Sequence, residues 1–183
     1  MRTIPIILLA GLLTACATDP AKVEAVASDE AARLKPPTRL LSTYDTFRLE
    51  QMTFGEAIQV EEKKMVEARE FETAFKAKIE PLLATWNAAD SASAEGTLSI
   101  QPHLAALRII SGGARFWAGA FAGDSFIDLD LRLVDADTGV VVADVRINRD
   151  ADAMTGAWSI GKSDQNLDEY IVAITEEYLT DSY

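Results

Sequence analysis

The chain has 183 residues, of which 49% are hydrophobic, and a formal net charge of −12 at pH 7. This hydrophobic content is enough for one core without disulfides or bound metals, so we expect a single folded domain. A surface this acidic repels nucleic acid, which is therefore excluded from the expected partners.

The first fifteen residues have the features of a secretory signal peptide. Arg2 gives a positive start, and residues 4–13 form an apolar run that is too short for the ~20 apolar residues of a membrane-spanning helix. Residues 13–15 (Leu-Thr-Ala) then precede Cys16, the only cysteine in the chain. This stretch resembles the bacterial lipobox, and the resemblance implies cleavage before Cys16 and lipidation of its thiol. An ordinary secretory signal with an incidental cysteine is the alternative.

Lipidation at Cys16 has three consequences for the mature chain. Cleavage removes Arg2 as the only charged residue of the signal, so the net charge moves from −12 to −13. No thiol then remains for disulfides, nucleophilic catalysis or metal binding, and the membrane becomes an expected partner through the lipid. Ala17 follows the cysteine, whereas an Asp there commonly signals inner-membrane retention in the lipoproteins that this lipobox resembles. The resemblance implies the outer membrane, facing the periplasm, with the inner membrane as the alternative.

Residues 16–40 are predicted to be the lipidated N-terminus and a flexible tether. They are rich in Ala, Asp, Glu and Lys, and contain Pro36-Pro37. A flexible chain of about twenty residues reaches roughly 25 Å, which would let the domain stand off the membrane. A weak helix is the alternative. Residues 41–183 are predicted to form the domain.

A strand and then a long helix are predicted to begin this domain. Residues 43–50 alternate in polarity, which is typical of a half-buried strand. An apolar stripe at helical spacing then predicts a helix with a buried face, and the charged residues between, Glu72 among them, predict a solvated face. Pro81 removes a backbone donor, so we expect a kink or a break there. The stripe consists of Met65, Ala68, Phe71, Phe75, Ile79, Leu82 and Trp86.

Three further strands are predicted after a polar loop. In residues 97–110 the apolar positions change from even to odd numbers, which predicts a β-bulge near Pro102-His103. Residues 127–133 and 143–147 each alternate apolar and charged side chains, as half-buried strands do. Residues 137–139 (Asp-Thr-Gly) suit a three-residue hairpin loop between them, with the glycine at positive φ.

The proposed loop also sets the register of this hairpin. With Ala136 and Val140 as the closing pair, the paired residue numbers sum to 276. This register places Arg132 opposite Asp144 and Asp130 opposite Arg146, and it places Leu131 opposite Val145 and Leu129 opposite Ile147. A register shifted by two would bring Asp130 against Asp144, which like-charge repulsion disfavours. Turn chemistry and charge therefore predict the same pairing.

A final helix completes the predicted domain, with Ser163 as its N-cap and an apolar stripe after it. The element order is strand, helix, three strands, helix. We therefore predict an α+β fold with about four mostly antiparallel strands, covered on one face by two helices. The stripe consists of Leu167, Tyr170, Ile171, Ile174 and Tyr178.

Few residues suggest catalysis or metal binding. His103 is the only histidine and no nucleophile-elbow motif accompanies any serine, so an incidental strand histidine is expected. A zinc site would need further histidines or thiols. Residues 135–139 superficially resemble a calcium loop, but they lack its third oxygen ligand and the loop glycine and glutamate. No metal and no cofactor are expected.

Paired carboxylates could act as a glycosidase, and peptidoglycan would be a local substrate. Asp128 and Asp130 lie two residues apart on one strand face. The register gives Asp130 a cross-strand arginine, which predicts a structural role. No catalytic residue is therefore assigned.

Residues 111–124 form the least ordinary segment, with four glycines and four alanines around three aromatic side chains. Their spacing fits neither a P-loop nor a dinucleotide-binding fingerprint. On a strand, Trp117 and Phe121 share one face while Phe116 points the other way. We predict Trp117 and Phe121 as a partner contact, with a bent strand packed under a helix as the alternative.

The segment from Gly96 to Asp150 resembles uncharacterised bacterial outer-membrane lipoproteins of a domain-of-unknown-function family. The shared features are a Leu-x-Ile strand at residues 98–100, a glycine-rich strand, and an Asp-x-x-Thr-Gly hairpin at residues 135–139. The resemblance implies a non-catalytic envelope accessory protein that binds an envelope protein or peptidoglycan. A small-molecule or glycan-binding lipoprotein is the second reading, and an envelope hydrolase is the third.

Overall fold

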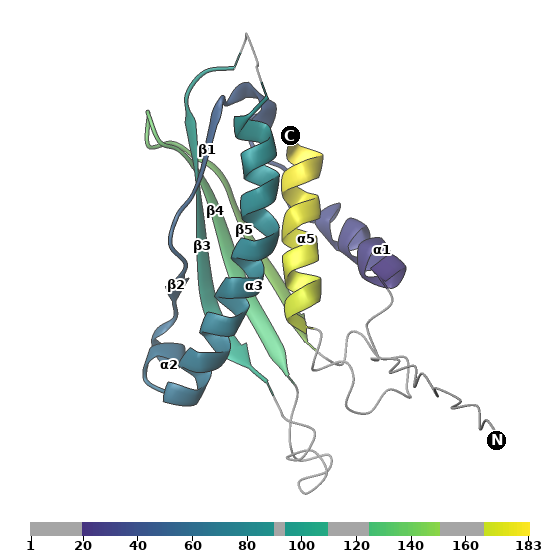
Figure 1. The fold of residues 1–183 in the computed structure, drawn as a ribbon, viewed down its shortest axis with the longest axis vertical. Coiled ribbons are helices and arrows are strands. Elements are labelled where there is room, and N and C mark those ends of the chain that lie inside the picture. Colours follow the sequence, from purple (N-terminus) through teal and green to yellow (C-terminus); the bar gives the residue numbers. More distant parts are fainter. Residues whose placement is uncertain (1–19, 90–93, 110–124, 151–166) are drawn as a thin grey trace, which may run out of the picture.

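The computed structural model describes residues 20–89, 94–109, 125–150 and 167–183, and it shows a sheet with helices packed on one face (Figure 1). The predicted α+β class is confirmed. The elements are α1 (Pro20–Ala31), the 3-10 helix η1 (Leu41–Thr43), β1 (Thr46–Leu49), β2 (Thr53–Phe54), α2 (Glu56–Gln59), α3 (Glu62–Asn87), β3 (Thr97–Arg108), β4 (Phe126–Asp135), β5 (Val141–Asp150) and α5 (Leu167–Ser182).

The sheet has five strands in the described part of the chain, in the order β1-β3-β4-β5, with β2 also pairing with β3. The pairs β3–β4 and β4–β5 are antiparallel, whereas β1 and β2 run parallel to β3. The prediction of about four strands did not include β2, because two residues are too few to show an alternating pattern. The helices α1 and α2 were not in the predicted set of two either.

The first edge of the sheet is interrupted opposite Pro102. β1 ends opposite Ile100 and β2 begins opposite His103. The carbonyls of Ile100 and Leu104 accept N–H groups from this edge, so Pro102, midway between them, also directs its backbone there. Proline has no backbone N–H group to donate to a neighbouring strand. None is needed here, because the gap between β1 and β2 leaves Pro102 without a strand partner on this edge.

The β-bulge in β3 lies slightly beyond its predicted position. The register with β4 shifts between Leu104 and Ala106, so the predicted bulge at Pro102-His103 is displaced by about two residues. The even-numbered residues from 98 to 104, Pro102 included, are buried. After the bulge the buried position is the odd-numbered Leu107. Gly55 lies against the bulge, where an added Cβ would clash with the carbonyl oxygen of Ala105.

The predicted register of the β4–β5 hairpin is confirmed from the pair Phe126–Asp150 to the pair Leu133–Ala143, whereas its closing pair is wrong. The register shifts at Val134, and the N–H of Asp135 donates to the carbonyl of Val140 at 2.9 Å. The carboxylate of Asp135 accepts the N–H groups of Asp137 and Thr138, a side-chain turn that adds one residue to the loop. Gly139 has φ +73°, as predicted.

The long helix α3 is continuous through Pro81, so of the predicted kink or break the break is wrong. Its buried stripe includes Leu83 rather than Leu82. Glu72, predicted on the solvated face, is 6% exposed and accepts hydrogen bonds from Arg69 at 2.6 Å and Lys76 at 2.7 Å. Burial alone would raise the pKa of Glu72, but these two bonds outweigh it and lower the pKa.

Within the segment predicted as a tether, residues 16–40, the described part from Pro20 onward begins with a helix that packs on the domain, as in the stated alternative. Helix α1 buries Val23, Ala27 and Ala31, one small side chain per turn, and lies beside α5. Beyond it, the N–H of Thr38 donates to the carbonyl of Val142 at 2.9 Å. The Tyr178 hydroxyl donates to the carbonyl of Lys35 at 2.9 Å, and burial raises the pKa of Tyr178 to about 12.

All five residues of the predicted stripe on α5 are buried, as expected. Ser163, the predicted N-cap, lies outside the described residues. Together, α3 and α5 cover one face of the sheet, and α1 lies on the other side of α5 from α3 (Figure 1). The opposite sheet face carries no helix in the described part of the chain.

Candidate functional site

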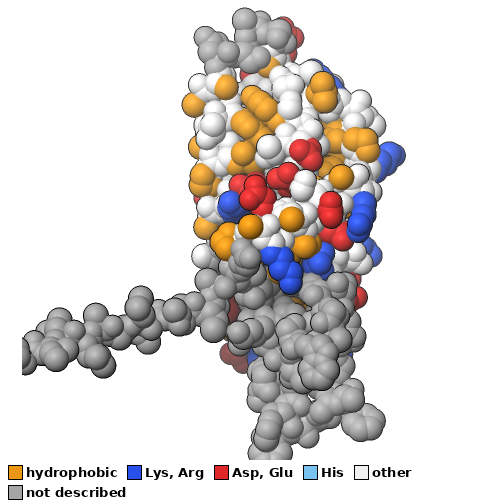
Figure 2. All heavy atoms as spheres, turned by 90° about the vertical axis from the view of Figure 1, so that its right-hand side faces the viewer, with side chains coloured by type: hydrophobic (Ala, Val, Ile, Leu, Met, Phe, Trp, Pro, Cys, Tyr) orange, Lys and Arg blue, Asp and Glu red, His pale blue; other side chains and the backbone are white. Residues whose placement is uncertain are grey.

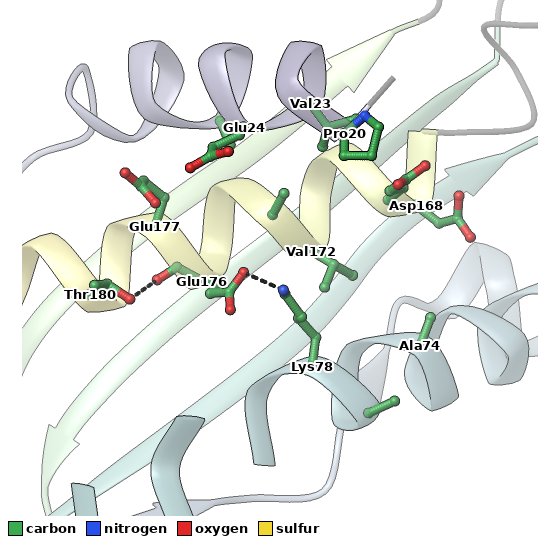
Figure 3. Close-up of a pocket in the computed structure, with 14 residues that line it drawn as sticks. Pro20, Val23, Glu24, Ala74, Lys78, Asp168, Val172, Glu176, Glu177 and Thr180 are labelled. Carbon is green, nitrogen blue, oxygen red and sulfur yellow. Dashed lines mark hydrogen bonds and ion pairs between the residues drawn. The ribbon is translucent and has the colours of Figure 1, made fainter. Parts of the chain in front are cut away.

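A groove of about 810 Å³ lies along α5, with α1 on one side and α3 on the other (Figure 3). The three helices contribute side chains that converge on it, and the apolar ones are small. Small side chains leave the space open, because nothing between the helices is bulky enough to fill it. The lining residues are Pro20, Val23, Glu24, Ala27, Ala74, Ala77, Lys78, Asp168, Glu169, Val172, Ala173, Glu176, Glu177 and Thr180.

The local sequence of each helix explains this shape. On α1, Val23 and Ala27 lie four residues apart and therefore share the face that packs beside α5. On α3, Ala74 and Ala77 lie three residues apart and form the opposite wall. On α5, Val172 is 7% exposed and contributes to the groove's apolar surface.

Carboxylates dominate the polar surface of the groove. Among the described residues that line it, five are acidic and only Lys78 is basic. Lys78 Nζ lies 3.0 Å from Glu176 Oε2, so the one cation is already paired. The four remaining acidic residues are Glu24, Asp168, Glu169 and Glu177.

The pKa of one groove carboxyl, that of Asp168, is raised. Burial raises the pKa of Asp168 above its ordinary value, and the negative charges of Glu169 and Glu70 add to this effect. The same side of the molecule is shown in Figure 2, where acidic side chains gather across the middle of the described surface. This surface is therefore complementary to a positively charged ligand.

A second hollow, of about 570 Å³, lies on the sheet face opposite the helices. It lies beside the gap between β1 and β2, and the half-buried Gln101 and the buried Pro102 are among its lining residues. Its polar groups are largely paired with one another. The pairs are Ser99 Oγ to Glu50 at 3.0 Å, Thr53 Oγ1 to His103 Nδ1 at 2.8 Å, and Arg146 to Asp130 at 2.6 and 3.0 Å.

His103 contacts Thr53 in this second hollow, on the opposite face of the sheet from Asp168. The only histidine and the carboxyl of raised pKa therefore do not share a site. Asp128 and Asp130, predicted to be structural, lie on β4, where Asp130 has its predicted arginine. Asp135 accepts the backbone N–H groups of Asp137 and Thr138 and forms an ion pair with Arg39 at 3.5 Å, and hydrogen bonds from Thr138 lower its pKa.

Within residues 20–89, 94–109, 125–150 and 167–183, no group of three or more His, Cys, Asp or Glu side chains is placed to hold a metal ion. In those same ranges, no helix combines the length and the apolar character that crossing a membrane requires. Cys16, Trp117 and Phe121 lie outside the described residues, so their predicted roles stay predictions.

Sequence reasoning did not find the groove. The available signal was the spacing of Val23, Ala27 and Ala31, which places three apolar residues on one side of a helix. It was weak because alanine is common on both buried and exposed helix faces. The complementary signal, the acidic excess on α5, is also typical of an ordinary solvated face.

No protein-family model matches the chain, and no curated protein matches it. Two crystal forms of a PelC dodecamer from Paraburkholderia phytofirmans are 10% identical, with TM-scores of 0.46 and 0.45. The matches cover 80% and 79% of this chain and 95% and 96% of those chains. A candidate lipoprotein from Caulobacter crescentus is 12% identical, with a TM-score of 0.32, over 87% of this chain and 91% of that one. At these values none of the three assigns a function or an assembly to this chain.

Proposed function

We propose that this chain is a lipid-anchored, periplasm-facing envelope protein that binds a positively charged segment of another envelope protein without catalysis. The observation that carries the proposal is the groove between α1, α3 and α5, with its five carboxylates and single paired lysine. Lysine or arginine side chains would meet the unbalanced acids, while the alanines and Val172 would receive apolar side chains beside them. An amphipathic basic helix combines both features.

Electrostatics favours such a partner over a neutral one. Two unit charges 4 Å apart attract by about 4 kcal/mol at the effective dielectric of a protein surface, before desolvation is subtracted. The raised pKa of Asp168 indicates that its ionised form is disfavoured in the free protein. A cation bound nearby would relieve part of this cost, and each net gain of about 1.4 kcal/mol would tighten binding tenfold.

The proposed membrane location is based on the lipobox at residues 13–16. Intact-mass measurement of the protein extracted from membranes is expected to show loss of residues 1–15 and acylation at Cys16. A soluble, unmodified product would contradict the anchor. Fractionation of the envelope would then distinguish the proposed outer membrane from the inner membrane.

Binding is tested with two probe peptides and the lipidated protein in nanodiscs. One peptide is an amphipathic helix with leucines on one face and lysines on the other, and the second has glutamates in place of the lysines. The lysine peptide is expected to bind, with an affinity that falls as salt is raised, whereas the glutamate peptide is not. Equal binding of both peptides, or of neither, would contradict the proposal.

Glycan or small-molecule binding is a second candidate, favoured by the 570 Å³ hollow on the open sheet face. Its hydroxyl, amide, carboxylate and guanidinium groups are suited to a polar ligand. Soluble peptidoglycan fragments would then shift the amide resonances of Gln101 and His103. Shifts confined to the groove, or none at all, would rule out this second candidate.

Trp117 and Phe121 remain a proposed additional contact for the partner. Replacing both with serine is expected to leave the free energy of unfolding within about 1 kcal/mol of the parent while weakening a crosslink to an envelope partner. A loss of several kcal/mol would instead identify them as core residues.

A further inference from the structure

The lipid attachment point and the folded domain are separated by very little chain. Helix α1 begins at Pro20, four residues after Cys16. Four residues span at most about 14 Å even when fully extended. Under the proposed function, in which Cys16 carries the lipid, the start of α1 is therefore held close to the membrane surface.

Helix α1 is also fixed to the rest of the domain. Val23, Ala27 and Ala31 are buried, at 6%, 2% and 4% exposure. At the far end of the helix, Glu30 Oε1 lies 3.6 Å from the guanidinium of Arg149, whose side chain is 9% exposed. These contacts join α1 to the body of the domain, so the anchor does not leave the domain free to rotate about a long tether.

The anchored end of the domain is defined by Pro20, Asp150 and Leu167. In Figure 1 the end of β5 and the start of α5 lie in the lower half of the fold, the start of α1 lies to their right, and the β4–β5 hairpin loop lies near the upper end. β5 has ten residues, which span roughly 33 Å at the usual rise of a strand. With β5 upright on the membrane, the hairpin loop would lie up to about 30 Å farther from the bilayer than Asp150.

The groove begins at this same end, because Pro20 and Asp168 both line it (Figure 3). We infer that the domain is seated on the membrane in one orientation, with the groove opening at the bilayer surface, and that its occupant is a basic helical segment adjoining a membrane span of the partner. This inference rests on the proposed function and specifies where the partner's segment lies. A segment next to a span would reach the groove without a long linker.

The orientation is tested by energy transfer from single labelled cysteines to an acceptor lipid in vesicles. Lys22→Cys marks the anchored end and Val140→Cys marks the hairpin loop, where Val140 is 58% exposed. The lipidated Cys16 does not react with the label, so each variant carries one. Transfer is expected to be strong from position 22 and weak from position 140. Equal transfer from both positions would overturn the inference.

A linker variant separates orientation from binding. Twenty Gly/Ser residues inserted after Ala17 are expected to remove the difference in transfer, because a flexible chain of that length reaches roughly 25 Å. The soluble lysine peptide should bind the parent and the linker variant equally. A vesicle-embedded single-span peptide with a lysine-rich flank should crosslink to Glu24→Cys in the parent at least threefold better than in the linker variant.

The outcomes distinguish the two proposals. If the soluble lysine peptide binds but the two labels report equal depth, or the embedded peptide crosslinks equally to parent and linker variant, the orientation is wrong and the groove assignment stands. If neither form of the lysine peptide binds, the groove assignment itself is wrong, whatever the labels report.

Discussion

The two outer surfaces of this domain carry charge in different ways. On the open sheet face, acids and bases are interspersed, so that Asp130 is bound by Arg146 and Arg132 lies opposite Asp144. On the helical side, the groove brings five carboxylates together with one lysine. The first arrangement pairs its charges within the chain, whereas among the described residues that line the groove the acids outnumber the bases five to one.

This difference separates charge that supports the fold from charge available to a partner. Cross-strand pairs follow from strand register and would form in any protein with this hairpin. In the groove, burial raises the pKa of Asp168, and the negative charges of Glu169 and Glu70 add to this effect. The comparison therefore identifies the groove, rather than the sheet face, as the better candidate for binding.

The largest expected effect contrasts the two sides of one strand. Leu131 on β4 is fully buried beneath the helices, while Arg132 is exposed on the open face. Leu131→Ala is expected to lower the free energy of unfolding by about 2–5 kcal/mol, because it leaves a cavity. Arg132→Ala should change it by less than about 0.5 kcal/mol. Comparable losses in urea denaturation would show that the open face is covered.

The hairpin loop that aligns the open face is expected to be the next most sensitive point. Gly139→Val places a β-branched residue at φ +73°, although nothing lies within 4 Å of the added Cβ. The cost is therefore backbone strain, about 1–2 kcal/mol in the free energy of unfolding. Gly139→Asn is the control, since asparagine tolerates this conformation. If both variants unfold at the denaturant midpoint of the parent, strain at residue 139 is unimportant.

The exposed pair on the open face should contribute less. Asp130 and Arg146 are 30% and 59% exposed, and such pairs couple by about 0.2–1 kcal/mol. A double-mutant cycle with Asp130→Asn and Arg146→Gln is expected to give a coupling in this range that shrinks with added salt. A coupling that salt does not reduce would mean that this face is shielded from solvent.

The smallest expected effect is on Asp168 in the groove, where substitution should raise the stability of the protein rather than lower it. Because its pKa is raised in the folded state, the fold favours the protonated carboxyl, and that contribution is lost as pH rises through the raised pKa. Asp168→Asn should therefore melt above the parent at pH 7, with the gap closing as pH falls toward the ordinary carboxyl pKa of about 4. Asp181→Asn on the exposed end of α5 is the control. A lower melting temperature for Asp168→Asn at pH 7 would contradict the assigned cost.

The fold was predictable where local chemistry and periodicity agreed. The register of β4 and β5 followed from a turn glycine and two charge pairs, and the stripes of α3 and α5 followed from helical spacing. The loop length was missed because it depends on where the Asp135 side chain finds its hydrogen bonds. Glu72 was missed because nothing in the chain order indicates that a helical glutamate will be buried beside Arg69 and Lys76.

The candidate site was far less predictable than the fold. The groove needs α1 beside α5, two helices separated by most of the chain, and the packing residues of α1 are mostly alanines. Alanine periodicity does not distinguish a docked helix from a tether. The sequence instead directed attention to Cys16, Trp117 and Phe121, which stay predictions that the experiments above address.

The most direct test of the groove compares two charge changes of equal size. Glu24→Gln, Glu169→Gln and Glu177→Gln neutralise three groove carboxylates, and Asp128→Asn, Asp130→Asn and Asp144→Asn neutralise three on the open face. Calorimetric titration of the lipidated protein with the lysine peptide should show at least a tenfold loss of affinity for the groove variant and less than a twofold loss for the other. Equal losses would mean that only net charge matters, and an unchanged groove variant would place binding elsewhere.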